Sequence, residues 1–525
     1  MQLNAEQQAV VNSIEGAFVV ISGPGSGKTA CMVERFLAMV TRGIPVSDIL
    51  NLTFTNSAAK EAAERVGLLN AEAVFRTFHS FALELIKRER EHLPFKLGET
   101  VIPVKGEDYL LLFDLVKAYP AISSFRVLQG KLSEWKRSNI EPEQAIAEAI
   151  GREYYLGCAY REYEDRCRAD GWLDFDSLIF ETVKLLETNE EVRNRWKKRY
   201  IAVDEFQDTD TRQLRMLELL FDGNLMCVGD TNQGIYTWRG AHPDVFKHIQ
   251  QKFPNVKTLY LGQNYRSSQK IVSFVKEITP EDNGISSRMM TTNEAGIDPA
   301  ITRYQDDQEE AVQTLLQITD PVNTVIMART NRQLFVFQRL CVSRGIKYRI
   351  LGKKDFFETS EVKKLLQLAK ESKDMRSADQ VLSSLIYEHN LLNIYRGSGD
   401  PMESDPAENL NSVVRMAQGK GTVPEFLERL RKLTYARKSA KGLTLSTVHQ
   451  MKGKQADHVF VVGVDQNRMP HRDGEIGEEK RIWFTACSRA AKTLNISFYG
   501  PRSEFLNDYI DKIEDYEPEL GERND

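Results

Sequence analysis

The stretch that most constrains this chain is residues 18–29, which read Phe-Val-Val-Ile-Ser-Gly-Pro-Gly-Ser-Gly-Lys-Thr. Four apolar residues predict a strand, the glycine-rich turn predicts a phosphate loop, and residues 31–40 predict the helix that follows. In such a loop the backbone N–H groups turn toward phosphate oxygens, and the start of the helix adds a partial positive charge. We therefore expect a nucleoside triphosphate to be held by the loop residues Gly23, Gly25, Ser26, Gly27, Lys28 and Thr29.

Two side chains of this loop carry specific chemistry. We expect Lys28 to reach the β- and γ-phosphates and the Thr29 hydroxyl to ligate Mg²⁺. One position departs from the usual pattern, because Ser22 stands where that pattern has a glycine. The alternative interpretation is a glycine-rich turn that only begins a helix.

A second stretch supplies two adjacent carboxylates. The apolar segment from Tyr200 to Val203 predicts a strand, and Asp204 and Glu205 follow it directly. At the end of a strand, Asp204 is placed to hold Mg²⁺. Glu205 is placed to act as a general base or to position the attacking water.

A third stretch is a loop that follows another apolar strand, residues 225–228. The loop reads Thr-Asn-Gln-Gly-Ile-Tyr-Thr-Trp-Arg-Gly-Ala from Thr231. We expect Gln233 to contact a γ-phosphate or its attacking water, and Tyr236 and Trp238 to face a nucleic-acid base. One loop would then touch both ligands. The alternative is that Trp238 lies in the core, which is the commoner position of tryptophan in an α/β domain.

Two further predicted strands end in small polar residues beside aromatic ones, at residues 49–56 and 74–81. Bases stack on aromatic rings while hydroxyls meet phosphates, so these ends favour contact with single-stranded nucleic acid. The alternative is that their phenylalanines belong to the core. From about Lys87 to Glu190 the pattern changes to amphipathic helices with no clear strand, which predicts a helical insertion.

Length and composition set the outer bounds. A chain of 525 residues is too long for one core, so we expect about three to four domains. The 41% hydrophobic and 28% charged residues are typical of a soluble protein, and no apolar run reaches about 18 residues. We expect a cytoplasmic protein without signal peptide or membrane span. The six cysteines form no Cys-x-x-Cys pair, which argues against structural zinc or an iron–sulfur cluster.

The net charge of −5 is unevenly distributed. Residues 503–525 hold nine acidic and two basic side chains, whereas residues 420–441 hold seven basic and two acidic ones. We expect the first stretch to be a solvated acidic tail. The second is either a surface that contacts phosphates or a solvated helix face.

The order of these segments resembles that of the UvrD/Rep-type superfamily 1 (SF1A) DNA helicases, ATP-driven motors that track 3′ to 5′ on single-stranded DNA. The likeness covers most of the chain. Its segments and the family motifs that they resemble are 3–7 (the adenine-reading Q motif), 22–29 (Walker A), 53–56 (Ia), 77–80 (Ib), 203–208 (Walker B), 229–241 (III), 263–268 (IV), 443–463 (V) and 481–490 (VI).

The resemblance implies roles for residues beyond the phosphate loop. It implies that Gln7 reads adenine, that Tyr265 stacks on adenine, and that Gln455 stands at the position that contacts the ribose. It implies that Arg266 meets the γ-phosphate and that Arg489 is the arginine finger, which stabilises charge developing on that phosphate. The DNA-contacting positions that it implies are Thr55, Asn56, Thr77, Phe78, His79, Tyr236, Trp238, Arg239, Arg329, Thr330, Asn331, Thr447 and His449.

The resemblance also implies the fold, which is α/β with two RecA-like P-loop motor domains. Each domain has a parallel sheet and carries a mainly helical insertion. The expected boundaries are 1–87 and 191–268 for the first motor domain, 88–190 for its insertion, 269–360 and 441–510 for the second motor domain, 361–440 for its insertion, and 511–525 for the acidic tail.

Two departures from the family pattern stand out. The family usually reads Lys-Gly-Leu-Glu-Phe in motif V, whereas this chain reads Lys-Gly-Lys-Gln-Ala, so that Gln455 replaces the glutamate at the ribose. The second insertion, about residues 360–440, is about half the family's usual size, and in the family this element bears on duplex contact, autoinhibition and processivity.

We expect an ATP-dependent DNA helicase or translocase acting in DNA repair, replication or recombination, with ATP and Mg²⁺ as cofactors. Its expected partners are single-stranded DNA, junctions of single- and double-stranded DNA, and a loading factor or single-strand-binding protein. We expect a monomer in isolation, association with the nucleoid when bound to DNA, and no membrane contact. One alternative is a translocase subunit that regulates a partner nuclease or polymerase without unwinding alone. Another is a different phosphate-loop enzyme such as a kinase, which leaves motifs V and VI unexplained.

Overall fold

A computed structural model describes residues 2–67, 74–103, 107–242, 244–253, 255–352, 356–394, 406–436 and 441–516. The chain divides into two compact units. Unit 1 comprises Met1–Gln263 and Asn283–Arg288, and unit 2 comprises Asn264–Asp282 and Met289–Asp525. None of the helices in the described ranges is both long and apolar enough to cross a membrane.

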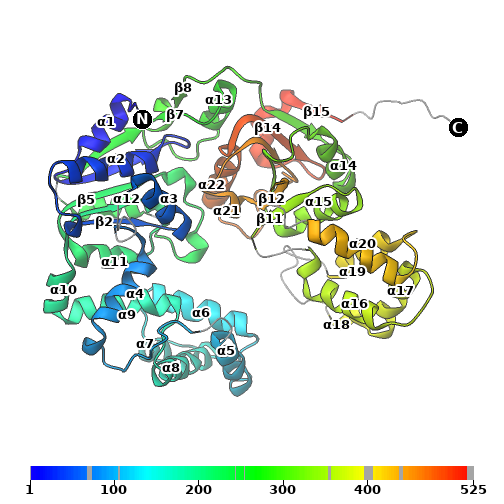
Figure 1. The fold of residues 1–525 in the computed structure, drawn as a ribbon, viewed down its shortest axis with the longest axis horizontal. Coiled ribbons are helices and arrows are strands. Elements are labelled where there is room, and N and C mark those ends of the chain that lie inside the picture. Colours follow the sequence, from blue (N-terminus) through cyan, green and yellow to red (C-terminus); the bar gives the residue numbers. More distant parts are fainter. Residues whose placement is uncertain are drawn as a thin grey trace. The chain divides into compact units, whose positions relative to one another are not determined.

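Unit 1 is built on a six-stranded parallel sheet (Figure 1). Its strands, in spatial order, are β3 (Phe75–Thr77), β2 (Ile49–Thr53), β4 (Lys198–Val203), β5 (Phe221–Gly229), β1 (Ala17–Ser22) and β6 (Lys257–Leu261). The register pairs Val203 with Cys227 and Ile21 with Gly229. Because the strands are parallel, the segments that follow β1, β2, β3, β4 and β5 all leave from the same edge of the sheet.

Helices cover this sheet and form the insertion between β3 and β4. They are α1 (Ala5–Asn12), α2 (Lys28–Thr41), α3 (Asn56–Val66), α4 (Phe78–Arg88), α5 (Glu107–Ala118), α6 (Phe125–Arg137), α7 (Pro142–Ala147), α8 (Arg152–Asp170), α9 (Phe175–Thr188), α10 (Glu190–Trp196), α11 (Thr211–Leu220) and α12 (Val245–Lys252). Leu128, Trp135, Tyr160 and Trp172 belong to an apolar cluster within the insertion. Other clusters, such as the one around Val20 and Met226, serve the sheet. The insertion therefore has a core of its own.

A buried cation lies within the insertion. The ammonium group of Lys136, at 2% side-chain exposure, lies 2.6 Å from a carboxylate oxygen of Glu164 and 2.6 Å from one of Asp174. It also lies 4.8 Å from the centre of the Tyr163 ring. An isolated buried charge is costly, and these partners offset that cost. They thereby hold α6 against α8 and the start of α9.

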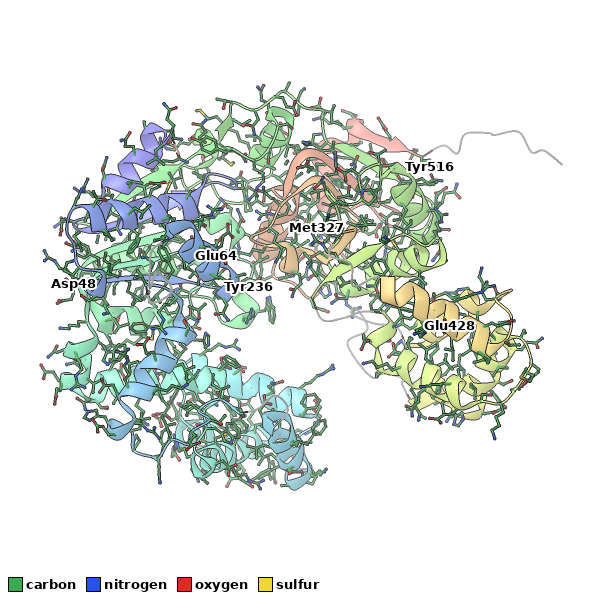
Figure 2. The ribbon with its side chains drawn as sticks, in the orientation of Figure 1. Asp48, Glu64, Tyr236, Met327, Glu428 and Tyr516 are labelled. Carbon is green, nitrogen blue, oxygen red and sulfur yellow. The ribbon has the colours of Figure 1, made fainter. Side chains whose placement is uncertain are left out.

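Unit 2 is built on a seven-stranded parallel sheet. Its strands, in spatial order, are β11 (Tyr348–Leu351), β12 (Leu443–Thr447), β10 (Thr324–Ala328), β13 (Ala456–Val461), β14 (Ala490–Phe498), β9 (Ala300–Arg303) and β15 (Ile513–Asp515). Met327, marked in Figure 2, lies in β10 and is fully buried. Two short strands stand outside these sheets, β7 (Gln263–Asn264) and β8 (Met290–Thr291).

The helices of unit 2 include a small insertion between β11 and β12. They are α13 (Gln269–Glu277), α14 (Asp307–Gln317), α15 (Asn331–Ser343), α16 (Ser360–Glu371), α17 (Ala378–Glu388), α18 (Leu391–Ile394), α19 (Pro406–Ala417), α20 (Val423–Ala436), α21 (Val448–Met451) and α22 (Ile476–Cys487). Leu365 of α16, Leu410 of α19 and Phe426 of α20 belong to the same apolar cluster as Ile326 of β10 and Leu445 of β12. The insertion of unit 2 and its sheet thus share one continuous core.

The predicted fold class is confirmed, since both units are α/β with parallel sheets. Between β3 and β4 the described residues form helices and connecting segments, as the pattern from Lys87 to Glu190 predicts. Most of the basic stretch at 420–441 lies on α20, and its residues 437–440 are outside the described ranges. The prediction of a solvated acidic tail is wrong for residues 504–515: Leu506 and Tyr509 of the 3₁₀ helix η9 (Glu504–Lys512) are buried, and Ile513–Asp515 form β15, which pairs with β9. Residues 517–525 of that tail lie outside the described ranges.

A buried carboxyl group in unit 2 makes stability depend on pH. Glu310 of α14 accepts hydrogen bonds from the Gly463 amide (2.9 Å) and the Ser497 hydroxyl (2.6 Å), and burial raises its pKa to about 7. A carboxyl whose folded-state pKa is raised favours folding at low pH. That contribution is lost as the pH rises from the unfolded value of about 4.5 toward 7.

Glu310→Gln cannot ionise, so we expect the variant to lack this decline in stability. The free energy of unfolding of the variant minus that of the parent then rises by at most about 1.4 kcal/mol per pH unit in this pH range. Above the range the difference is constant. Thermal midpoints of both proteins between pH 4.5 and 8 measure the difference. A difference that does not change with pH contradicts the assignment.

Candidate nucleotide and nucleic-acid site

The phosphate loop of unit 1 joins β1 to α2. Gly25 and Gly27 adopt positive φ angles of 68° and 82°, and Gly27 is the residue that precedes the first turn of α2. L-residues with a side chain rarely adopt such angles, which explains the glycines. The Ser22 hydroxyl donates a hydrogen bond to the carbonyl of Gly229 at 2.8 Å. The serine in place of the usual glycine therefore ties β1 to β5 below the loop.

The polar groups around the loop fit a nucleoside triphosphate. The buried hydroxyl of Ser26 has no hydrogen-bond partner among the described residues. A phosphate oxygen would supply one. The ammonium group of Lys28 lies 3.7 Å from a carboxylate oxygen of Glu205, and the Thr29 hydroxyl donates to Asp204 at 3.3 Å. The loop thus brings a cation, a hydroxyl and two carboxylates together, which is the donor set expected for phosphates and a divalent ion.

The two carboxylates stand at the end of β4. Burial, and then the charge of Glu205, raise the pKa of Asp204 to about 6. A divalent cation bound to Asp204 would favour its ionised form. Glu205 is less buried and has φ of 50°, a backbone conformation that is uncommon for a non-glycine residue and often found at functional sites.

Gln207, which was not singled out from the sequence, connects this acid pair to the next strand. Its amide nitrogen donates to Glu205 at 2.6 Å, and its amide oxygen accepts from the backbone N–H of Asp230 at 3.0 Å. A Cβ on Gly229 would lie 2.2 Å from that oxygen, so a larger residue there would displace the amide from this position. The position of Gln207 two residues after Glu205 is the only signal that the sequence offers.

Gln233 lies on the loop after β5, in the short 3₁₀ helix η5 (Thr231–Gln233). It is buried, and its amide nitrogen donates to Asp230 at 2.5 Å. Burial raises the pKa of Asp230. Gln233 therefore lies beside the strand end that Gln207 links to Glu205.

Gln7 is fully buried and lies on α1. Its amide nitrogen donates to the Ser26 carbonyl at 3.1 Å, and its amide oxygen accepts from the Asn4 backbone N–H at 3.1 Å. In this structure the amide supports the phosphate loop and the start of α1. Recognition of adenine by Gln7 stays a prediction.

An aromatic and cationic cluster lies on the same edge of the sheet. The ring of Phe54 stacks on Tyr236 with centroids 5.5 Å apart, and Trp238 lies 6.5 Å from Tyr236 (Figure 2 marks Tyr236). The guanidinium of Arg239 lies 5.4 to 5.8 Å from all three ring centres. Trp238 is 68% exposed, so the alternative that it belongs to the core is wrong. An exposed ring supported by two half-buried rings and a cation suits single-stranded nucleic acid.

The ends of β2 and β3 lie beside each other. Thr55 and Thr77 begin α3 and α4 by accepting backbone hydrogen bonds, and Thr77 donates to Asn56 at 3.4 Å. His79 follows on α4, and burial lowers its pKa, so the ring is neutral near pH 7. Phe78 is only 3% exposed, which does not favour the predicted contact with DNA. The exposed Phe175 of α9 meets His79 edge to face at 5.9 Å and was not singled out from the sequence.

Unit 2 carries the two predicted catalytic arginines. The Arg266 guanidinium donates to the Gln455 side chain at 2.7 Å and to the Ser488 carbonyl at 2.8 Å. Arg489 is 1% exposed and donates to the carbonyl of Thr485 and the hydroxyl of Ser488, at 2.9 and 2.8 Å. Tyr265, next to Arg266, is 41% exposed. Gln455 therefore contacts an arginine here, and its contact with the ribose stays a prediction.

The predicted DNA-contacting residues of unit 2 follow β10 and β12. Arg329 forms a two-pronged ion pair with the buried carboxylate of Glu479, with nitrogen-to-oxygen distances of 2.6 to 3.1 Å. Thr330 precedes α15, which begins at Asn331. Thr447 ends β12 and is 7% exposed, and the partly buried His449 lies on α21. Parallel pairing of β10 with β12 brings these strand ends together.

Comparison with known proteins gives two matching family models. The UvrD/REP helicase N-terminal domain matches residues 3–254, and the UvrD-like helicase C-terminal domain matches residues 259–389 and 367–500.

Three curated proteins are similar over nearly the whole chain. ATP-dependent DNA helicase Rep of Escherichia coli (strain K12) is 28% identical over 96% of this chain and 92% of its own length. ATP-dependent DNA helicase PcrA of Staphylococcus epidermidis is 26% identical over 94% of this chain and 83% of its own length. ATP-dependent DNA helicase UvrD1 of Mycobacterium tuberculosis is 26% identical over 98% of this chain and 86% of its own length.

The acid pair makes a prediction about hydrolysis. Glu205→Gln keeps the size of the side chain and removes its ability to take a proton, while Lys28 and Ser26 are unchanged. We expect the variant to bind ATP with near-parental affinity and to hydrolyse it about 10² to 10⁴ times more slowly. Equilibrium binding of a fluorescent ATP analogue and steady-state phosphate release measure the two effects. A variant that turns over ATP at the parental rate contradicts the role of Glu205.

Proposed function

This chain belongs to the UvrD/Rep family of ATP-dependent DNA helicases, and from that premise we propose that it moves 3′ to 5′ along single-stranded DNA and separates duplex ahead of it. The observation that carries the proposal is the loop after β5. Within six residues it presents the buried Gln233, bonded to Asp230 at the strand end that Gln207 links to Glu205, and the exposed Trp238 in the aromatic cluster. A shift of this loop on hydrolysis would change how Trp238 contacts a base. A translocating motor requires such a link between hydrolysis and contact with DNA.

The residues of the phosphate loop and the acid pair supply the chemistry of hydrolysis in this proposal. Lys28 neutralises charge on the β- and γ-phosphates, and Glu205 orients the attacking water and accepts its proton. Thr29 and Asp204 hold Mg²⁺, which supplies charge neutralisation at the phosphate oxygens when bound. Gln7, Tyr265 and Gln455 contact the nucleoside.

We extend the proposal to the domains and partners. Residues 1–87 with 191–268 and residues 269–360 with 441–510 act as motor domains, and residues 88–190 and 361–440 act as their insertions. The substrates are single-stranded DNA and junctions with duplex, in repair, replication or recombination. The protein acts as a monomer in isolation and accepts a loading factor or single-strand-binding protein.

Arg266 and Arg489 are the proposed catalytic arginines of unit 2. We expect Arg489→Lys to lower the maximal rate of ATP hydrolysis by about 10³-fold with little change in ATP affinity, because a lysine does not reproduce the planar fork of the guanidinium. The thermal midpoint serves as the control, since Arg489 is buried and bonded to neighbouring groups. A large loss of ATP affinity at an unchanged maximal rate makes Arg489 a ground-state binding residue instead.

Strand displacement tests the whole proposal. We expect the purified protein with ATP to separate a duplex that carries a 3′ single-stranded tail, but not one with a 5′ tail or blunt ends.

We expect Trp238→Ala to lose roughly 1–3 kcal/mol of single-strand affinity at an unchanged thermal midpoint, because the ring is exposed. Tyr387→Ala removes another exposed ring, 89% exposed on α17, and serves as the control. DNA-stimulated hydrolysis without strand displacement favours a subunit that regulates a partner, and displacement from the 5′ tail overturns the polarity.

A further inference from the structure

The last residue of α6 in the insertion of unit 1 contacts the loop that carries Trp238. The Arg137 guanidinium donates a hydrogen bond through Nη1 to the backbone carbonyl of Arg239. Its Nε lies 3.4 Å from Oδ1 of Asp176, on α9. The other oxygen of Asp176 accepts from the Ser133 hydroxyl at 2.5 Å. Asp176 therefore positions the Arg137 guanidinium, which in turn binds the loop through the Arg239 carbonyl.

The loop is shaped to receive this side chain. Gly240 has φ of +90°, and a Cβ at that position would lie 3.1 Å from Cδ of Arg137. A larger residue would be strained and would press on the arginine stem. Glycine at the residue after Arg239 thus lets Arg137 reach the carbonyl.

The end of α6 is itself firmly fixed. The neighbouring Lys136 is buried against Glu164 and Asp174, as described above. Its backbone carbonyl accepts from the guanidinium of Arg212, on α11, at 3.3 Å. That guanidinium lies 4.1 Å from the centre of the Phe180 ring. Arg137 therefore projects from a rigid point of the insertion.

The loop, by contrast, reaches into solvent. Trp238 and its neighbours in the 3₁₀ helix η6 (Thr237–Arg239) are exposed. Beyond Gly240 the chain is tied back, because Ala241 bridges to Asp210 and the His242 amide donates to the Thr209 carbonyl at 2.9 Å. The Arg239 carbonyl lies between this tie and the exposed ring.

We propose that Arg137 is a positioning residue for DNA, through which the helical insertion holds the loop of residues 237–241 and sets how Trp238 meets a base. This inference rests on the proposed function of the loop. The guanidinium acts through the Arg239 carbonyl and does not itself contact a phosphate. A single cationic hydrogen bond of this kind is worth about tenfold in an equilibrium constant.

The test compares single-strand affinity and the ratio of DNA-stimulated to DNA-free ATP hydrolysis among variants, with oligo(dT) as the probe. We expect Arg137→Ala to lower both about tenfold, and Arg137→Lys to recover little, because an ammonium group cannot bridge Asp176 and the Arg239 carbonyl as the fork does. Arg161→Ala removes an exposed arginine of the same insertion, paired with Glu143 at 3.2 Å, and is the matched control. Thermal midpoints verify that each variant is folded.

Two further variants separate positioning from direct contact with DNA. Asp176→Ala removes a negative charge, so a purely electrostatic role of Arg137 predicts tighter DNA binding, whereas positioning predicts weaker binding. In the Trp238→Ala background, Arg137→Ala has little additional effect if it acts through the ring. Full recovery by lysine, tighter binding by Asp176→Ala, or additive losses overturn the proposal. A parent protein that DNA does not stimulate overturns the proposed function itself.

Discussion

The amide of Gln207 connects the two strand ends on which both ligand surfaces of unit 1 are built. It donates to Glu205 after β4 and accepts from the backbone after β5, where Gly229 leaves the space that it needs. A buried amide satisfied on both sides has one favourable orientation, so it fixes the distance between the two ends. The acid pair and the loop that carries the aromatic cluster are therefore connected through this one side chain.

The fold was largely predictable because its signals are local. Apolar runs followed by polar turns mark β1, β4, β5 and β10, and parallel strands must gather the residues after them at one edge. The same logic predicted the closeness of Lys28, Thr29, Asp204 and Glu205. Neither sheet order nor the extent of each core could be derived, since both depend on pairings between residues far apart in the chain.

The details of the site were less predictable, because a side chain's partners are set by tertiary structure. Nothing in the sequence around Gln7 indicates that its amide supports the phosphate loop, and nothing around Arg329 indicates its ion pair with Glu479. Phe78 and Trp238 are both aromatic residues beside predicted strand ends, yet one is buried and the other is exposed. Exposure depends on what packs above a residue, which motif spacing does not reveal.

The two insertions differ in how they are joined to the sheets, and this bears on how the chain can change in evolution. The insertion of unit 1 has its own apolar core and a buried ion-pair network, so its internal packing is separate from that of the sheet. The helices of the insertion in unit 2 share one core with β10 and β12. Deleting those helices would expose apolar side chains of β10 and β12, so we expect a change in length to be tolerated best where this insertion does not cover the sheet.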